Sequence, residues 1–436
     1  MRDHTSLARS LSGSLSGSLL ASSLKTFFAA TLLALLVAAC GGGGGGSGGT
    51  AASSSSGGTT TALSAPSSPA LAANAVRVTV DSGVSNVPNM PFVSITICTP
   101  GTSQCQTIDH VLVDTGSWGV RIFASQLPAS VALPQEKDNA GNSLAECMQF
   151  FDGYTWGSVR LADMQIAGEK AASLPVQVID PNYASLPSTC ASFGASRNTP
   201  SALQANGILG IGVFKHDCGA NCVQQAVDGT YYACNGSTSC TSIPLAEPYQ
   251  VANPIPYFAT DNNGSMLSLP TVSGGAQSVS GQLVFGIGTQ TNNTLGGAQV
   301  IGVSPSNGTF TTVQNGTTYS QSILDSGSTG LFFATSAMPV CASPNSSYYC
   351  PASTEQMSAM IQGVNGVTSA VNFSVGNATA IAQTYSGSSA LPLLAGPAFV
   401  KSTIFDWGLP FFYGRNVYAA VEQQVTPGGT GPYVAY

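Results

Sequence analysis

Short apolar runs separated by turn residues dominate the chain from about residue 76 onward. β-Branched and aromatic residues fill these runs, and Gly, Pro, Asn or Asp interrupts them every eight to fifteen residues or so, which is typical of strands and tight turns. The clearest examples are Val76–Val80, Phe92–Ile97, Val111–Val113 and Val176–Ile179. Helical periodicity is scarce, with short candidates at Ser353–Val364 and near Ser125. The pattern predicts an all-β protein.

Two of the apolar runs end in a similar polar sequence. Val111-Leu112-Val113 leads into Asp114-Thr115-Gly116-Ser117, and Ser322-Ile323-Leu324 leads into Asp325-Ser326-Gly327-Ser328. An ionised carboxylate at the end of a buried strand is costly unless another group compensates it. A single Asp of this kind is more often a turn residue, but two in matching contexts suggest that the carboxyls lie together.

A third element extends this similarity into an internal repeat. Asn206-Gly207-Ile208-Leu209-Gly210 follows Asp114, and Phe411-Phe412-Tyr413-Gly414 follows Asp325, each roughly 90 residues later. A period this long indicates two related lobes rather than a solenoid. We therefore expect lobes at 76–280 and 281–436 with a cleft between them, where a site would form.

The N-terminal region has the pattern of an export signal. Basic residues precede the apolar run Phe27–Ala39, which is too short for a permanent membrane span, and Val37-Ala38-Ala39-Cys40 resembles a bacterial lipobox. We expect 1–40 to be a lipoprotein signal peptide, with lipidation at Cys40 and an outer-membrane, envelope location. An ordinary signal peptide is the alternative. Residues 41–75, rich in Gly, Ser, Ala and Thr, predict a flexible tether.

Composition and charge narrow the possible partners. Charged residues make up only 7%, the net charge is −7, and no basic run could follow a phosphate backbone, so nucleic acid is not expected as a partner. Of eleven Cys, ten remain beside Cys40, and an even number in an exported chain predicts disulfides. Close spacing suggests Cys98/Cys105, Cys234/Cys240 and Cys341/Cys350 as pairs. Zinc at His216, Cys218 and Cys222 is a weaker alternative within an apparent surface insertion at 214–243.

Taken together, these segments resemble the pepsin-like aspartic proteases. Asp114–Ser117 and Asp325–Ser328 resemble the two active-site loops, and Ile208-Leu209-Gly210 and Phe412-Tyr413-Gly414 the segments beneath them. Tyr154-Thr155-Trp156-Gly157 resembles the flap hairpin, and Gly281–Gly286 the strand that opens the second lobe. The resemblance implies a bilobal pepsin-like acid protease fold in a bacterial lipoprotein. Trp118–Arg121 departs from the pattern because it places a charge where an apolar run is expected, and Phe150–Gly153 is unusual for a flap.

The resemblance implies aspartic endopeptidase chemistry on a polypeptide substrate, by a monomer without metal or cofactor. Two carboxyls in contact share one proton, so that one activates water and the other binds the scissile carbonyl; aspartic proteases are the standard example. We expect Asp114 and Asp325 to react and Tyr154 and Gly157 to belong to the flap. The loop residues that would support the pair are Thr115, Gly116, Ser117, Ser326, Gly327 and Ser328. A non-catalytic binding or inhibitor module on the same scaffold, and a β-rich envelope adhesin or scaffold, are the alternatives.

Other hydrolytic mechanisms fit less well. The mature chain would keep only His110 and His216, and no Gly-x-Ser-x-Gly motif supports a serine triad. Oxidised cysteines would not provide a nucleophilic thiolate.

Overall fold

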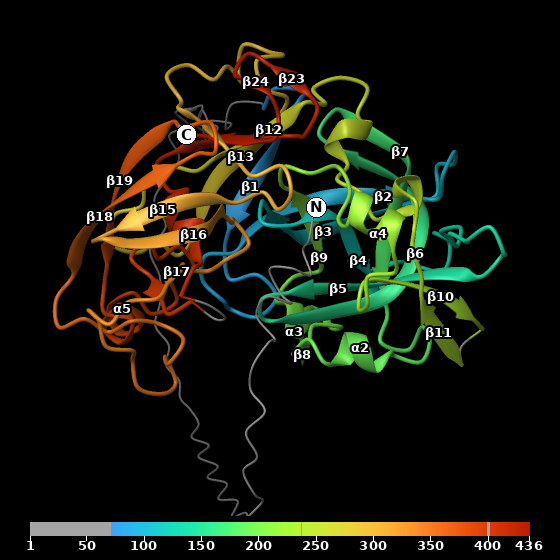
Figure 1. Ribbon diagram of the computed structural model, residues 1–436, viewed down its shortest axis with the longest axis horizontal. Coiled ribbons are helices and arrows are strands. Elements are labelled where there is room, and N and C mark those ends of the chain that lie inside the picture. The colour runs from blue at the N-terminus through green and yellow to red at the C-terminus, as the bar shows by residue number, and fades with distance from the viewer. Residues whose placement is uncertain (1–70, 237, 399–401) are drawn as a thin grey trace, which may run out of the picture. The chain divides into compact units, whose positions relative to one another are not determined.

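The computed structural model describes residues 71–236, 238–398 and 402–436. Leu71–Tyr436 belongs to one compact unit whose regular elements are mostly strands, so the all-β prediction is confirmed (Figure 1). The predicted signal peptide, Cys40 and the tether as far as residue 70 lie outside the described residues.

The N-terminal half is organised around a closed ring of strands. The ring follows the order β2–β3–β9–β4–β7–β6, and an additional pairing of β6 with β2 closes it. Its strands are β2 (Pro91–Cys98), β3 (Cys105–Asp114), β4 (Trp118–Phe123), β6 (Gly153–Ile166), β7 (Glu169–Ile179) and β9 (Gly207–Ile211). Side chains such as Val78, Val111, Val113 and Ile122 are fully buried in the main core.

The same sheet extends from the ring in two directions. On one side it continues through β5 (Ser143–Phe150), β10 (Tyr231–Asn235) and β11 (Ser239–Ser242), with the short β8 (Ala195–Ser196) paired to β6. On the other it continues through β1 (Ala75–Val80), β13 (Val279–Phe285), β12 (Gly264–Ser268), β22 (Asn416–Ala420), β25 (Tyr433–Ala435) and β14 (Val300–Gly302). The predicted boundary at 280/281 therefore falls inside β13.

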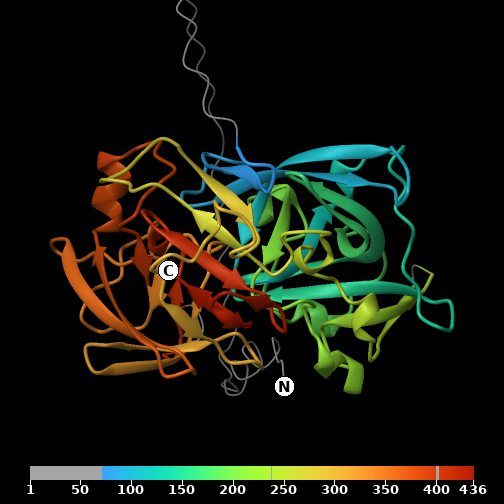
Figure 2. The same ribbon diagram turned by 90° about the horizontal axis from the view of Figure 1, so that it is seen from above.

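The C-terminal half contains a second, seven-stranded sheet (orange in Figure 1; seen from above in Figure 2). Its order is β19 (Thr368–Val375), β18 (Glu355–Gln362), β15 (Phe310–Gln314), β16 (Thr317–Leu324), β21 (Phe405–Trp407), β17 (Leu331–Phe333) and β20 (Ala395–Gly396). A separate pair joins β23 (Val425–Thr426) to β24 (Gly429–Thr430). The predicted helix at Ser353–Val364 is wrong, because this segment forms β18, which pairs along its length with β19.

Helices are short throughout the described residues. They are α2 (Ser188–Ala191), α3 (Pro200–Leu203), α4 (Ala220–Gln224) and α5 (Ala378–Thr384), with 3₁₀ turns at Ala124–Gln126, Glu247–Tyr249, Ile255–Tyr257 and Leu409–Phe411. The helical candidate near Ser125 is thus a single 3₁₀ turn. Among the described residues no helix has the length and apolar character needed to cross a membrane.

Five disulfides connect the ten cysteines. The three close pairs predicted from spacing are all present, at Cys98–Cys105, Cys234–Cys240 and Cys341–Cys350. The other two are Cys147–Cys190 and Cys218–Cys222. The zinc alternative is therefore wrong, because the thiols of Cys218 and Cys222 are bonded to each other. The segment that carries them is not a mere surface insertion, since β10 pairs with β5 and Tyr231 is fully buried.

The two halves repeat one local arrangement of strands. In the first half β3 pairs in parallel with β9, which pairs antiparallel with β4. In the second half β16 pairs in parallel with β21, which pairs antiparallel with β17. The partner of the second Asp strand is thus Phe405–Trp407 followed by Gly408. The predicted partner, Phe412-Tyr413-Gly414, instead follows the 3₁₀ turn Leu409–Phe411.

Candidate functional site

Asp114 and Asp325 occupy equivalent positions at the ends of parallel-paired strands. Asp114 is the last residue of β3, and Asp325 directly follows β16 with its N–H donating to Trp407 O. The apolar runs that precede them are buried, so each strand carries its carboxyl into the interior. Asp114 is 6% exposed and Asp325 is 9% exposed.

Reciprocal hydrogen bonds lock the two loops together. Thr115 Oγ1 donates to Leu324 O over 2.9 Å and accepts the Ser326 N–H over 2.9 Å. In the same way Ser326 Oγ donates to Val113 O over 2.7 Å and accepts the Thr115 N–H over 3.1 Å. Each hydroxyl therefore bridges to the opposite loop, and the four bonds fix the relative position of the two Asp residues.

Donors from within each loop hold the carboxyls. The Gly116 N–H donates to Asp114 Oδ1 over 2.8 Å, and the Ser117 hydroxyl donates to Asp114 Oδ2. The Gly327 N–H donates to Asp325 Oδ1 over 2.8 Å, and Ser328 Oγ lies 2.9 Å from Asp325 Oδ2. This arrangement leaves little freedom for either carboxyl to rotate.

The absence of a side chain at the two loop glycines lets the carboxyls approach each other. A Cβ atom at Gly116 would lie 2.6 Å from Asp325 Cγ, and one at Gly327 would lie 2.9 Å from Asp114 Oδ1. Each glycine thus faces the carboxyl of the opposite loop. The structure brings together all eight residues predicted for the pair and its support, namely Asp114, Thr115, Gly116, Ser117, Asp325, Ser326, Gly327 and Ser328.

The electrostatics of the pair favour a shared proton. Burial, the neighbouring Asp406 carboxyl and the Asp114 carboxyl raise the pKa of Asp325 well above its usual range. Asp325 also has a side-chain hydrogen bond with Asp114. Two carboxyls this close repel each other when both are charged, which favours a single proton between them.

Asp406 is a third carboxyl at the site, and sequence reasoning missed it. It lies in the middle of β21, is 3% exposed, and its Oδ2 is 2.6 Å from Ser328 Oγ. Burial and the charge of Asp114 raise the pKa of Asp406 to about 8, against the opposing effect of the Ser328 hydrogen bond. An isolated Asp between Phe405 and Trp407 matches no motif, and only the pairing of β21 with β16 brings it here.

The carboxyls open into a cavity of about 400 Å³. Both loops line it, together with Leu112 and Ile208 from the first half and Ile323 and Asp406 from the second. The β5–β6 hairpin forms another wall, to which Met148, Gln149, Phe150, Phe151 and Asp152 contribute. The sides of the cavity therefore combine apolar and polar residues, and its base is acidic.

The hairpin differs from the prediction in the residue that it presents. Tyr154 does not line the cavity but packs with Trp156, Tyr232 and the Cys147–Cys190 disulfide. Side chains alternate between the two faces of a strand, and in this register Tyr154 points away from the cavity and toward Trp156 and Tyr232. Gly157 also lies away from the cavity, where a Cβ would be 1.9 Å from Val178 O, so it permits the close approach of β7.

The hairpin tip is held from several directions. The Arg197 guanidinium lies 2.6 Å from the Asp152 carboxylate, and β8 pairs in parallel with Gly153 and Tyr154. The Cys147–Cys190 disulfide ties β5 to α2. These contacts hold the hairpin in place over the cavity.

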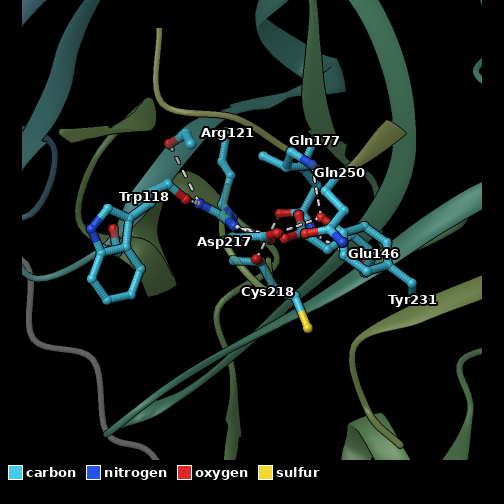
Figure 3. Close-up of polar contacts among 12 residues, drawn as sticks. Trp118, Arg121, Glu146, Gln177, Asp217, Cys218, Tyr231 and Gln250 are labelled. Atoms are coloured by element: carbon cyan, nitrogen blue, oxygen red, sulfur yellow. Dashed lines mark hydrogen bonds and ion pairs between the residues drawn. The ribbon is translucent and has the colours of Figure 1, made fainter. Parts of the chain in front are cut away.

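The unexpected charge at Arg121 belongs to a buried cluster behind the first loop. Its Nη2 lies 2.6 Å from Glu146 Oε1 and 3.0 Å from Asp217 Oδ2, and Tyr231 donates to Asp217 (Figure 3). Burial alone would lower the pKa of Arg121, but the two carboxylates outweigh it and raise that pKa. Burial and Glu146 raise the pKa of Asp217 well above its usual range. Arg121 thereby connects β4, which follows the Asp114 loop, to the hairpin strand β5.

These features define an all-β protein with two interlocked Asp-Ser/Thr-Gly-Ser loops and a buried carboxyl pair beneath a hairpin. Residues 70–436 match the model of the family described as protein of unknown function (DUF3443). The match covers most of the chain, so the protein belongs to this family. A comparison with curated proteins found no match.

Proposed function

We propose that this protein is an aspartic endopeptidase with a bilobal pepsin-like fold, anchored to the bacterial envelope through lipid at Cys40. The observation that carries the proposal is the reciprocal locking of the two Asp loops, by the four hydrogen bonds that join Thr115 and Ser326 to the opposite loop. The repeated strand arrangement β3–β9–β4 and β16–β21–β17 supports two related lobes.

The geometry suits hydrolysis by an activated water. We assign the shared proton of the pair to Asp325, whose pKa burial and the neighbouring Asp406 and Asp114 carboxyls raise, and the role of general base to Asp114. A water between them loses a proton to Asp114 while Asp325 donates to the scissile carbonyl oxygen. The water oxygen bonds to the carbonyl carbon to give a tetrahedral intermediate. Its C–N bond then breaks as Asp114 passes the proton to the amine nitrogen and the former carbonyl oxygen returns a proton to Asp325, so both products leave without a covalent intermediate on the protein.

The cavity walls support a polypeptide as substrate. Leu112 and Ile208 line one side of the carboxyl pair, and Phe150 and Phe151 of the hairpin lie in the same cavity. These side chains would bind the residues that flank the scissile bond and exclude water from it.

Asp114→Asn and Asp325→Asn test the proposal directly. Asp114→Asn removes the general base, and Asp325→Asn removes the carboxyl that holds the shared proton. Both changes keep the shape of the side chain, and we expect each to lower peptide cleavage by at least about 1,000-fold. The measurement is cleavage of a diverse peptide library between pH 3 and 7. Thermal unfolding should show that both variants still fold.

Asp228→Asn is the matched control, because Asp228 is exposed and does not line the cavity. It should cleave like the native protein. If the native protein cleaves no peptide but a hydroxyl-containing transition-state mimic raises its melting temperature, the non-catalytic binding module replaces the enzyme.

A further inference from the structure

Asp406 breaks the equivalence of the two halves at the base of the cavity. In the first half Leu112 is in register with Ile208, and in the second Ile323 is in register with Asp406. Leu112 and Ile323 each precede the loop Asp by two residues, so Asp406 stands where the first half has Ile208. A carboxyl thus replaces an apolar side chain at one of two equivalent positions.

Ser328 lies between Asp406 and Asp325. Its Oγ is 2.6 Å from Asp406 Oδ2 and 2.9 Å from Asp325 Oδ2, and both are hydrogen-bond distances. A serine hydroxyl has a single hydrogen and can donate it to only one of these oxygens. At the other contact the carboxyl must be protonated and donate to Ser328 Oγ. The equivalent Ser117 has a hydrogen bond to Asp114, and the residue at the equivalent of Asp406 is apolar.

The surroundings of Asp406 indicate which carboxyl donates to Ser328 Oγ. Its Oδ1 is buried without a hydrogen-bond partner, whereas Asp325 Oδ1 accepts the Gly327 N–H. Ile323 on β16 and Phe332 on β17 are in register with it, and both are apolar. The ion pairs found among the described residues do not include Asp406.

Few titratable groups face Asp406 across the site. Asp325 and Asp114 on the two loops are its acidic neighbours, and the other titratable groups among the described residues that line the cavity are Tyr348, Asp152 and Arg197. A buried carboxylate with an unpaired oxygen and acidic neighbours is far more costly than a neutral carboxylic acid in the same place.

We propose that Asp406 is a neutral positioning residue, which donates its proton to Ser328 Oγ and so directs the Ser328 hydroxyl hydrogen onto Asp325 Oδ2. The inference deepens the proposed function and rests on Asp325 being one of the two reacting carboxyls. The raised pKa of Asp406, about 8, agrees with a neutral acid over the acidic and neutral range. Ionisation above that range removes the donated hydrogen bond and adds a charge beside the pair.

A carboxyl titration by NMR tests the protonation state without reference to activity. The full chain is labelled with ¹³C at the aspartate carboxyls, and Asp406→Asn identifies the Asp406 signal by its loss. We expect this signal to keep the chemical shift of a neutral acid from pH 5 to pH 7 and to move near pH 8. If the Asp406 signal moves below pH 5, the proposal is overturned.

Two substitutions at Asp406 separate hydrogen bonding from packing. In Asp406→Asn the amide still donates to Ser328, so kcat at pH 5 should stay within about threefold of the native value. We expect the native kcat to fall above pH 8, where Asp406 ionises, and this fall should be absent in Asp406→Asn. Asp406→Leu removes the donor, and kcat should fall at least about tenfold with KM little changed. If Asp406→Leu folds and cleaves at the native rate, Asp406 does not position Ser328.

Failure of the endopeptidase proposal and failure of the Asp406 assignment give different experimental results. A chain that cleaves no peptide but shows a neutral Asp406 at pH 7 refutes the enzyme and leaves the hydrogen-bond assignment intact. A chain that cleaves peptides while Asp406 titrates like an exposed Asp keeps the enzyme and overturns the positioning role.

Discussion

Single residues at the site divide into those with a sequence signature and those without one. Asp114 and Asp325 could be predicted because each closes an apolar run and starts the same short motif. Asp406 could not, because its role depends on β21 lying beside β16, which only the folded chain establishes. For the same reason the pattern of two apolar residues and a glycine led to Phe412-Tyr413-Gly414, while the pairing uses Trp407-Gly408 a few residues earlier.

Gly116→Ala should damage the carboxyl pair more than the fold. The added methyl group would lie 2.6 Å from Asp325 Cγ, so that carboxyl must move by most of an ångström. Misplacement on this scale costs about 100-fold in rate, and overpacking costs about 1–3 kcal/mol in the free energy of unfolding. Peptide cleavage and urea denaturation measure the two effects.

Gly297→Ala is the control for this substitution. A Cβ at Gly297 meets no atom within 4 Å, and its φ is not in the left-handed region. It should leave cleavage and stability unchanged. Equal activity of the two variants would show that the close approach of the loops is not needed.

At the level of elements, strands were easier to predict than their partners. The main apolar runs all became strands, but Ser353–Val364 was misassigned because two of its apolar residues, Met357 and Ile361, also fit a helical spacing. In the structure Ala359 and Ile361 face the core in alternation, and pairing with β15 and β19 settles the strand. The hairpin was correctly located, but its register, which decides between Tyr154 and Phe150 as the residue facing the cavity, depends on packing against Trp156 and Tyr232.

Removing the Cys147–Cys190 disulfide should loosen the hairpin. The bond closes a loop with a sequence separation of 43, for which chain entropy predicts a loss of about 4 kcal/mol in the free energy of unfolding. Replacing both cysteines by Ser should also speed amide hydrogen exchange at Phe150–Tyr154. Denaturation and exchange mass spectrometry give the two readouts.

The Cys98–Cys105 pair is the comparison for this prediction. Its separation of 7 predicts a smaller loss, about 2.5 kcal/mol, and it lies in strands outside the hairpin. Exchange at Phe150–Tyr154 should not change in that variant. If both double substitutions affect the hairpin equally, the disulfide does not hold it specifically.

On the scale of the whole molecule, buried acids govern the response to pH. Asp217, Asp325 and Asp406 belong to two separate clusters, and burial is the largest cause of the raised pKa in each case. Charged residues make up only 7% of the chain, so few surface ion pairs can offset the effect of these buried acids on stability. The sequence does not reveal which carboxyls are buried.

We expect the free energy of unfolding to fall as pH rises from 5 to 8.5. A carboxyl whose pKa is higher in the folded state than in the unfolded chain stabilises the fold at low pH, and this contribution is lost as pH rises toward the folded pKa, about 8 for Asp406. The loss should amount to a few kcal/mol, since each pKa unit corresponds to about 1.4 kcal/mol. Urea denaturation at the two pH values measures it.

Asp406→Asn should reduce this pH dependence, because an amide does not ionise. A native protein equally stable at pH 5 and pH 8.5 would contradict the burial of protonated carboxyls.

Membrane attachment is predicted from the sequence alone. Cys40→Ser should prevent lipid attachment, so that the protein moves from the membrane fraction to the soluble fraction and no longer incorporates labelled fatty acid. Persistent membrane association of the folded variant would indicate another mode of attachment, whereas a native protein already in the soluble fraction would favour the ordinary signal peptide.

The position of β1 sets a limit on how far the chain can be trimmed from its N-terminal side. Proteolysis before Leu71 would leave the folded body intact, because β1 begins only at Ala75. A cut that removed β1 would be different, since β1 lies between β2 and β13 and pairs with both. Its loss would divide the large sheet and leave unpaired strand edges, which promote aggregation. A protease can thus trim the chain on the N-terminal side of β1, but a cut that removes Ala75–Val80 would destroy the large sheet.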